Sequence, residues 1–316
     1  MSDAKPSLEQ LKQQLLAAET AGDPARQAVA LNNLGSYYKE QREIAKATEH
    51  FLKALEFFSV LQDMERKGTV LINLGGAFHD AGEYQKALEY FAMALGTYGS
   101  LGNAFGQGMA VNNLGGVHLL LKSYDDARSL FQLAISFFQA AQAPTWEAQA
   151  FENLAGAELA MGNTKAAIES YGRALELWQK ANQLERQAVI LNRIGNLHSA
   201  SGAIERAVDL HNRAVTLARQ AGKRSLEASA QMAIGRVHLQ ARDWTAAYTH
   251  LTEAAKIYEE GGDKRGHAVA LLDLAKLNFG AGRDLLEAAA AMFKEVGDAA
   301  GERAARELMD GKSKSV

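Results

Sequence analysis

Residues 71–98, LINLGGAFHDAGEYQKALEYFAMALGTY, contain the pattern from which the fold follows. Both halves of this stretch place apolar or small residues at the spacing of one helix face. These are Leu71, Leu74, Gly75 and Phe78 in the first half, and Ala87, Phe91, Ala94 and Tyr98 in the second. Between them, Asp80-Ala81-Gly82-Glu83 is typical of a turn. The stretch therefore predicts a hairpin of two helices.

The same pattern returns every 40 residues along almost the whole chain. The pair of a large apolar residue and a small residue recurs without insertion or deletion at Leu34-Gly35, Leu74-Gly75, Leu114-Gly115, Leu154-Ala155, Ile194-Gly195, Ile234-Gly235 and Leu274-Ala275. Because one hairpin cannot bury its apolar faces alone, successive hairpins must stack on one another. The sequence predicts an all-α solenoid of about seven hairpin units, without β-structure.

The order of these residues resembles the tetratricopeptide repeat (TPR). Leu74, Gly75 and Phe78, followed by Ala87 and Phe91, match the large, small and aromatic positions of that family. The usual period is about 34 residues, so a period of 40 implies longer helices. The Asn-Leu-Gly triplet and the long period are similar to the subgroup typified by the spindle-orientation adaptor LGN and kinesin light chain, and to the peptide-sensing domains of bacterial quorum-sensing regulators. The resemblance implies a superhelix whose concave side, lined by the first helices, binds ligands.

The ends of the chain depart from the repeat. Residues 7–20 resemble a lone second helix that caps the first unit, and six full units then run to about residue 265. The seventh unit is shortened, and a short helix at about 299–309 closes the array near residue 310. We expect a single array over residues 7–310, with disordered segments at 1–6 and 311–316.

The composition excludes several classes of function. The chain has 316 residues, with 34 basic and 37 acidic side chains and a formal net charge of −3, so no positive excess favours nucleic acid or an anionic membrane. The absence of cysteine excludes disulfides, thiolate zinc sites and iron–sulfur clusters. No apolar stretch approaches the roughly 20 residues that span a bilayer, and the N-terminus does not resemble a signal peptide. We expect a cytoplasmic protein that needs no cofactor, and the sequence leaves its oligomeric state open.

One position of the first helix, on the face opposite the hairpin core, carries asparagine in four consecutive units. Along the chain this position holds Asn33, Asn73, Asn113, Asn153, Arg193, Ala233 and Asp273. An asparagine side chain both donates and accepts hydrogen bonds, so such a ladder can bind the backbone of an extended peptide. The resemblance implies this role for Asn73, Asn113 and Asn153, and small neighbours such as Gly116 would let a ligand approach closely. The alternative is that these asparagines bond to the adjacent repeat and only fix the superhelix.

Charge is polarised along the same face. Glu40 and Asp80 lie in the early units. The later units carry Arg193, Asn196, Arg236 and Lys276, with Asp273 partly offsetting Lys276. Arginine can pair bidentately with a carboxylate, so acidic groups of a ligand should prefer the later units.

Signals for other chemistry are weak. His118, His198 and His238 share one register, but whole repeats separate them, so we expect them in the hairpins and not at one metal ion. No metalloprotease, nucleophile-elbow or dinucleotide motif is present in the sequence. We expect a non-enzymatic adaptor or receptor whose partner is a protein or an extended, acidic peptide. Two alternatives remain: a self-associating scaffold with an unused groove, and the sensory half of a regulator.

Overall fold

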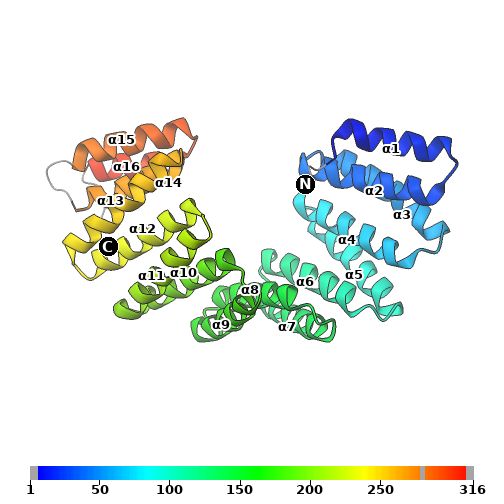
Figure 1. Cartoon of the computed structure of the whole chain (residues 1–316), viewed down its shortest axis with the longest axis horizontal. Helices are drawn as coiled ribbons and strands as arrows, with labels where there is room; N and C mark the ends of the chain where they lie inside the picture. Colours follow the sequence, from blue (N-terminus) through cyan, green and yellow to red (C-terminus); the bar gives the residue numbers. More distant parts are fainter. Residues whose placement is uncertain (1–5, 278–281, 311–316) are drawn as a thin grey trace. The chain divides into compact units, whose positions relative to one another are not determined.

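A computed structural model describes residues 6–277 and 282–310, and within these ranges all regular structure is helical (Figure 1). The helices are α1 (Leu8–Thr20), α2 (Pro24–Glu40), α3 (Ile44–Val60), α4 (Met64–Asp80), α5 (Tyr84–Ser100), α6 (Ala104–Leu120), α7 (Tyr124–Ala140), α8 (Pro144–Ala160), α9 (Thr164–Lys180), α10 (Leu184–Ala200), α11 (Ile204–Gln220), α12 (Arg224–Gln240), α13 (Trp244–Glu260), α14 (Lys264–Ala275), α15 (Gly282–Glu295) and α16 (Ala299–Met309). The predicted all-α fold of consecutive hairpins is confirmed.

The even-numbered helices from α2 to α14 are the first helices of the hairpins, and each is followed by its second helix. α1 is a second helix without a first, which confirms the predicted N-terminal capping helix. The last hairpin is shortened as predicted, since α14 has 12 residues where α4 has 17. α16 then stands in the place of one more first helix.

Contacts divide the chain into two compact units, Met1–Ser170 (unit one) and Tyr171–Val316 (unit two), with the boundary inside α9. Within each unit, the second helix of a hairpin packs most extensively on its own first helix and next on the first helix of the following hairpin. The single array over residues 7–310 stays a prediction. The disorder predicted for residues 1–6 and 311–316 concerns, apart from Pro6, residues outside the described ranges.

Close packing of the two helices in a hairpin depends on glycine beneath a large side chain. At Gly35 an added Cβ atom would lie 2.5 Å from the ring of Phe51, and at Gly75 it would lie 2.5 Å from the ring of Phe91. Both phenylalanines are buried. The Leu-Gly pair is therefore the point where the second helix crosses the first in these two hairpins.

Short turns join the helices, and most of them place one residue in the left-handed conformation. Glycine fills this position at residues 22, 82, 102, 162, 202, 222, 262 and 297, whereas Arg42, Gln62, Lys122, Gln142, Asn182 and Arg242 adopt it at other turns. Side-chain caps start several first helices: Asp63 accepts a hydrogen bond from the backbone N–H of Arg66, and Asn103 accepts one from Gly106. The capping residues explain why these helices begin where they do.

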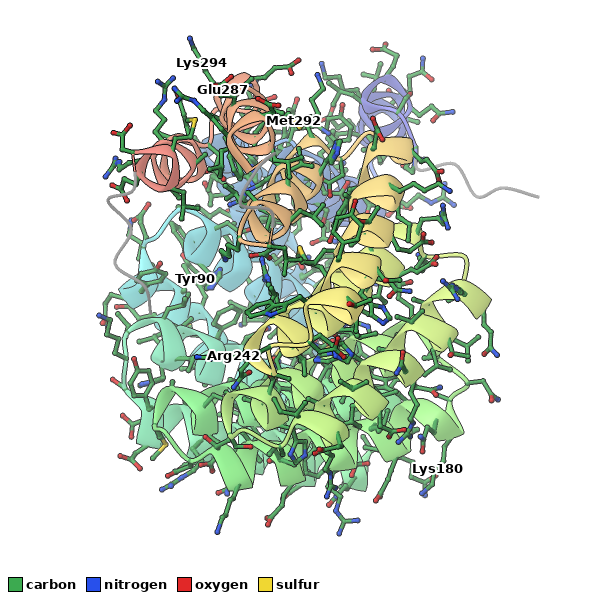
Figure 2. All side chains as sticks on the ribbon, turned by 90° about the vertical axis from the view of Figure 1, so that its left-hand side faces the viewer. Tyr90, Lys180, Arg242, Glu287, Met292 and Lys294 are labelled. Carbon is green, nitrogen blue, oxygen red and sulfur yellow. The ribbon has the colours of Figure 1, made fainter. Side chains whose placement is uncertain are left out.

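The C-terminal end of the array is polar. Arg306 of α16 occupies the register of the buried Leu271 of α14 and pairs with Glu302 at 2.7 Å. A hairpin stacked on this face would have to bury these charges. Figure 2 shows Glu287 and Lys294 of α15 reaching outward as well. Among the described residues, no helix is long and apolar enough to cross a membrane.

Candidate functional site

We use the term ladder face for the surface of the first helices that carries the ladder positions, in each unit taken by itself. In unit one these positions are Asn33 on α2, Asn73 on α4, Asn113 on α6 and Asn153 on α8. The side chain of Asn33 is exposed, and the other three asparagines are half-buried. All four lie at the same position of a first helix.

Two of the four asparagines connect neighbouring first helices. The Nδ2 atom of Asn73 donates to Oδ1 of Asn32 at 2.9 Å, and Nδ2 of Asn153 donates to Oδ1 of Asn112 at the same distance. These bonds link α2 to α4 and α6 to α8. Asn73 and Asn153 are therefore struts between repeats, the role that the alternative interpretation gave to the whole ladder.

The other two asparagines of the ladder do not connect neighbouring helices. Among the described residues, the side chains of Asn33 and Asn113 form no hydrogen bond, so their donor and acceptor groups are available to a ligand. From one hairpin to the next, an asparagine without a hydrogen bond therefore alternates with an asparagine that acts as a strut.

The small residues beside the ladder also differ among units. A Cβ atom added at Gly116 or Gly156 would meet nothing within 4 Å, so the backbone of α6 and α8 is open there. At Gly76 the ammonium of Lys39 occupies the space instead, 2.7 Å from where a Cβ would stand, and it pairs with Asp80 at 3.6 Å. A ligand backbone can therefore come closest at α6 and α8.

In unit two the ladder face carries the predicted polar and basic side chains. The guanidinium of Arg193 on α10 lies 5.7 Å from the centre of the Tyr171 ring, a distance typical of a cation–π contact. Asn196, one turn further along α10, is exposed. Both side chains reach the surface on the same helix.

Arg236 and Lys276 are engaged by one buried carboxylate. Asp273, only 3% exposed, accepts from Nε of Arg236 at 2.5 Å and from Nζ of Lys276 at 2.7 Å. The three residues line a pocket of about 300 Å³ that Leu308 of α16 also lines. The sequence predicted that Asp273 partly offsets the charge of Lys276, and in the structure Asp273 offsets the charge of Arg236 as well. An acidic ligand group would therefore compete with Asp273 for both cations.

The three histidines of shared register are half-buried. Nδ1 of His118 lies 3.7 Å from a carboxylate oxygen of Asp126, and His238 stacks on His250 with ring centres 5.7 Å apart. In the described ranges no cluster of three or more histidine, aspartate or glutamate side chains could hold a metal ion.

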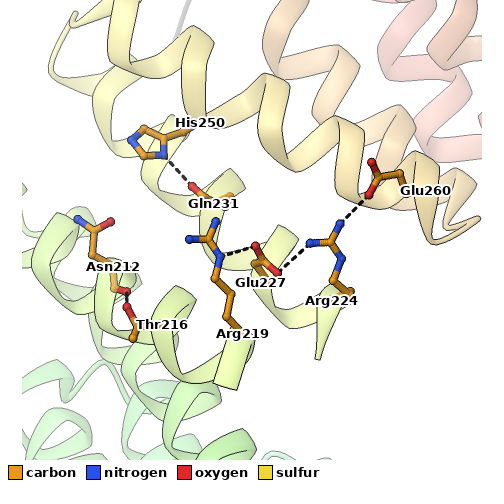
Figure 3. Close-up of polar contacts among 8 residues, drawn as sticks. All are labelled: Asn212, Thr216, Arg219, Arg224, Glu227, Gln231, His250 and Glu260. Carbon is orange, nitrogen blue, oxygen red and sulfur yellow. Dashed lines mark hydrogen bonds and ion pairs between the residues drawn. The ribbon is translucent and has the colours of Figure 1, made fainter. Parts of the chain in front are cut away.

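Sequence reasoning missed a buried ionic network at the start of α12 (Figure 3). Glu227 is 2% exposed, and its carboxylate accepts from Nε of Arg219 at 2.7 Å and from Arg224 at 3.3 Å. Arg224 also reaches Glu260 on α13 at 2.6 Å. The equivalent residues of the earlier units, such as Gln107 and Glu147, are also polar and are half-buried, so the repeat pattern carries no signal for this network.

The family of the chain follows from its match to a repeat profile. The profile of the tetratricopeptide repeat matches residues 26–100, 106–180 and 146–220, more than half of the chain. The chain belongs to the tetratricopeptide repeat family. A second profile, that of the soluble NSF attachment protein, matches residues 196–309 of this TPR chain. No curated protein sequence matches it.

Solved structures share the fold of this TPR protein at low sequence identity. Aspartyl phosphate phosphatase F from Bacillus subtilis aligns with a TM-score of 0.63 and 19% identity, over 96% of this chain and 77% of its own. A Rap protein complexed with competence and sporulation factor aligns with a TM-score of 0.58 and 15% identity, over 98% and 80%. The kinesin light chain-like repeats of Podospora anserina give a TM-score of 0.52 and 14% identity, over 61% and 95%. At these identities the likeness is one of fold.

Proposed function

We propose that this TPR protein is a non-catalytic adaptor or receptor that binds an extended peptide, or a linear segment of a protein, on its ladder face. The observation that carries the proposal is the alternation along unit one, where Asn73 and Asn153 fix neighbouring helices while Asn33 and Asn113 keep their amide groups unpaired. The Rap protein of similar fold is complexed with competence and sporulation factor, which supports a ligand-binding role for an array of this kind.

The contact with the peptide is made through its backbone. The amide of Asn113 can accept from a peptide N–H and donate to a peptide carbonyl, and the open backbone at Gly116 and Gly156 leaves room for the ligand chain. These contacts use backbone groups that every peptide has, so they contribute affinity and set the direction of the peptide chain. Recognition of the peptide's side chains must come from other residues.

Acidic groups of the peptide are proposed to lie at unit two. The ladder face there carries the basic side chains Arg193, Arg236 and Lys276, together with the carboxylate of Asp273. A carboxylate of the ligand can pair with these basic side chains, and it would compete with Asp273 for Arg236 and Lys276. This preference should weaken with salt, since the charges are exposed to solvent.

A selection from a phage-displayed library of random peptides tests the proposal. Peptides enriched on the wild-type chain are measured against the Asn33→Ala, Asn113→Ala double variant and against Arg193→Glu. We expect the double variant to bind about 10-fold more weakly or worse, since an unpaired ligand amide costs about 1–3 kcal/mol, and Arg193→Glu to weaken acidic peptides in particular. Gln132→Ala, on the exposed face of α7, is the matched control and should bind as wild type does.

Two outcomes contradict the proposal. If the enriched peptides bind the double variant and the wild type equally, the ladder is not the binding surface. If Arg193→Glu has no effect and affinity is constant between about 0.05 and 0.5 M salt, the acidic preference is wrong while peptide binding stands.

A second candidate function, self-association as a scaffold, is favoured by one observation. Leu52, Met93 and Leu133 on the second helices of three successive hairpins are 44%, 50% and 45% exposed. Light scattering over a range of concentrations tests it, and the Met93→Lys, Leu133→Lys double variant should then stay monomeric where the wild type associates.

A further inference from the structure

His211 replaces an aromatic or aliphatic residue in the core of one hairpin. The corresponding residue of the second helix is Phe51, Phe91, Phe131, Tyr171 or Leu251 in the other full units, and it packs against the glycine or alanine of the first helix. His211 does the same: it is fully buried, and a Cβ atom at Gly195 would lie 2.6 Å from its ring. The fifth hairpin, α10–α11, therefore has a titratable ring where its neighbours have hydrocarbon.

The hydrogen-bond partner of His211 explains why a histidine replaces the aromatic or aliphatic residue at this position. Its Nδ1 atom lies 2.6 Å from Oδ1 of Asn192, so Nδ1 carries the proton and donates to the amide oxygen. Two earlier units also have asparagine in the register of Asn192, namely Asn32 and Asn112, and the oxygens of both accept from the struts of the next repeat. In the repeat after α10 the strut position is Ala233, which has no donor. His211 supplies the hydrogen bond that the missing strut would have made.

The other ring nitrogen has no partner. Nε2 of His211 is buried and forms no hydrogen bond, and Nε2 of His198, on α10, is in the same condition. An imidazolium has two N–H donors, whereas among the described residues only Asn192 forms a hydrogen bond with this ring. Protonation would place a charge and an unpaired donor in an apolar core.

The surroundings contain little that could stabilise that charge. Burial alone lowers the pKa of His211 to about 4, and no charged group of the helices packed against it contributes. Burial also lowers the pKa of His198, and Arg206 of α11 lowers it further. In the next hairpin, burial and the neighbouring His238 lower the pKa of His250, whose ring nitrogen faces Oε1 of Gln231 at 2.7 Å (Figure 3).

We propose that the α10–α11 hairpin is an acid-labile element of the array, which opens when His211 takes up a proton. α10 carries Arg193 and Asn196 on the ladder face, so opening displaces both side chains. The release of a bound peptide by acid would follow, and this consequence alone rests on the proposed function.

The direction and size of the effect follow from proton linkage. At pH 7.5, about one unit above the ordinary pKa of 6.5, the ring is mostly neutral in the closed and the opened hairpin, and stability is close to its full value. As the pH falls from 6.5 toward about 4, the opened form binds a proton that the closed form excludes, so opening becomes more favourable. For one group with these two pKa values, the opening equilibrium rises about 30-fold between pH 7.5 and 5.

Hydrogen–deuterium exchange of the full chain without ligand, corrected for the intrinsic exchange rate at each pH, tests the proposal. Between pH 7.5 and 5, we expect opening of α10–α11 to rise about 30-fold, and opening of α4–α5, which has Phe91 in this position, to change by less than about threefold. His211→Phe should remove most of the rise in α10–α11. The variant fits the site, because Phe51 and Phe131 pack on Gly35 and Gly115 beside Asn32 and Asn112.

The reciprocal variant keeps the test decisive if His211→Phe does not fold. Phe131→His places the same ring beside Asn112, and it should make α6–α7 acid-labile in the same pH range. An unchanged rise in His211→Phe overturns the proposal, and so does an α6–α7 hairpin that stays closed at pH 5 in Phe131→His. Because no ligand is present, neither result depends on whether the ladder face binds a peptide.

Discussion

At the scale of single residues, Asn153 and Asn113 have the same side chain and different surroundings. The amide of Asn153 donates a hydrogen bond across the gap between α6 and α8, whereas that of Asn113, which is also half-buried, forms no hydrogen bond to the described residues. We expect Asn153→Ala to lower the free energy of unfolding by about 0.5–1.5 kcal/mol, because one partly buried hydrogen bond is lost. Asn113→Ala should change it by less than about 0.5 kcal/mol. Urea denaturation of the two variants measures this difference, and equal effects would show that Asn113 also supports the fold.

Two adjacent glycines of α6 make a second comparison. At Gly115 a new Cβ would lie 2.7 Å from the ring of Phe131, so Gly115→Ala should cost about 1–3 kcal/mol through overpacking. At Gly116 nothing lies within 4 Å, so Gly116→Ala should stabilise the helix by up to about 1 kcal/mol. Thermal unfolding followed by circular dichroism gives the sign of each change. If both substitutions changed the stability in the same direction, Gly115 would not face the core while Gly116 faces an open surface.

At the scale of elements, the turns contain residues that are poorly suited to their conformation. Gln142 has φ of 52° in the turn before α8, where the turn before α6 has Gly102 with φ of 62°. We expect Gln142→Gly to stabilise the protein by about 0.5–1 kcal/mol, because a side chain is unfavourable in the left-handed region. Gly102→Ala should destabilise it by a similar amount. Guanidinium unfolding midpoints test the pair, and a loss of stability in Gln142→Gly would show that the glutamine side chain stabilises the turn.

At the scale of the whole molecule, each hairpin depends on its immediate neighbours. Deleting residues 64–103 removes α4 and α5 as one period and brings α3 beside α6, where Phe58 would meet Gly106 in the way that Tyr98 does now. The shortened chain should keep the same helix content per residue and one cooperative transition. Circular dichroism and thermal unfolding measure both quantities.

Deleting residues 84–103 is the control, because it removes α5 alone and joins two first helices in succession. Their apolar faces would have no second helix to cover them, so this chain should lose helix content or aggregate. A control that folds as well as the full-period deletion would mean that the hairpin is not the unit of stability.

The sequence by itself determined the fold class, the hairpin, the position of the turns and the two unusual ends. Each of these follows from local periodicity: the 40-residue recurrence of Leu74-Gly75 and its equivalents requires identical packing in every unit, and the missing residues of the seventh unit shorten one hairpin. The ladder positions could also be read from the sequence, since a residue's place on a helix fixes the face on which it lies.

Only the tertiary structure decided what each ladder residue does. Asn73 and Asn113 are equivalent in register, yet Asn73 donates to an asparagine of the previous first helix and Asn113 does not. In the same way, Asp273 forms ion pairs with both Arg236 and Lys276. Asn192 accepts a hydrogen bond from His211, because the next repeat has no asparagine strut to supply one. Hydrogen bonds and ion pairs act over about 3 Å between residues far apart in the chain, so periodicity places them on a face but cannot pair them.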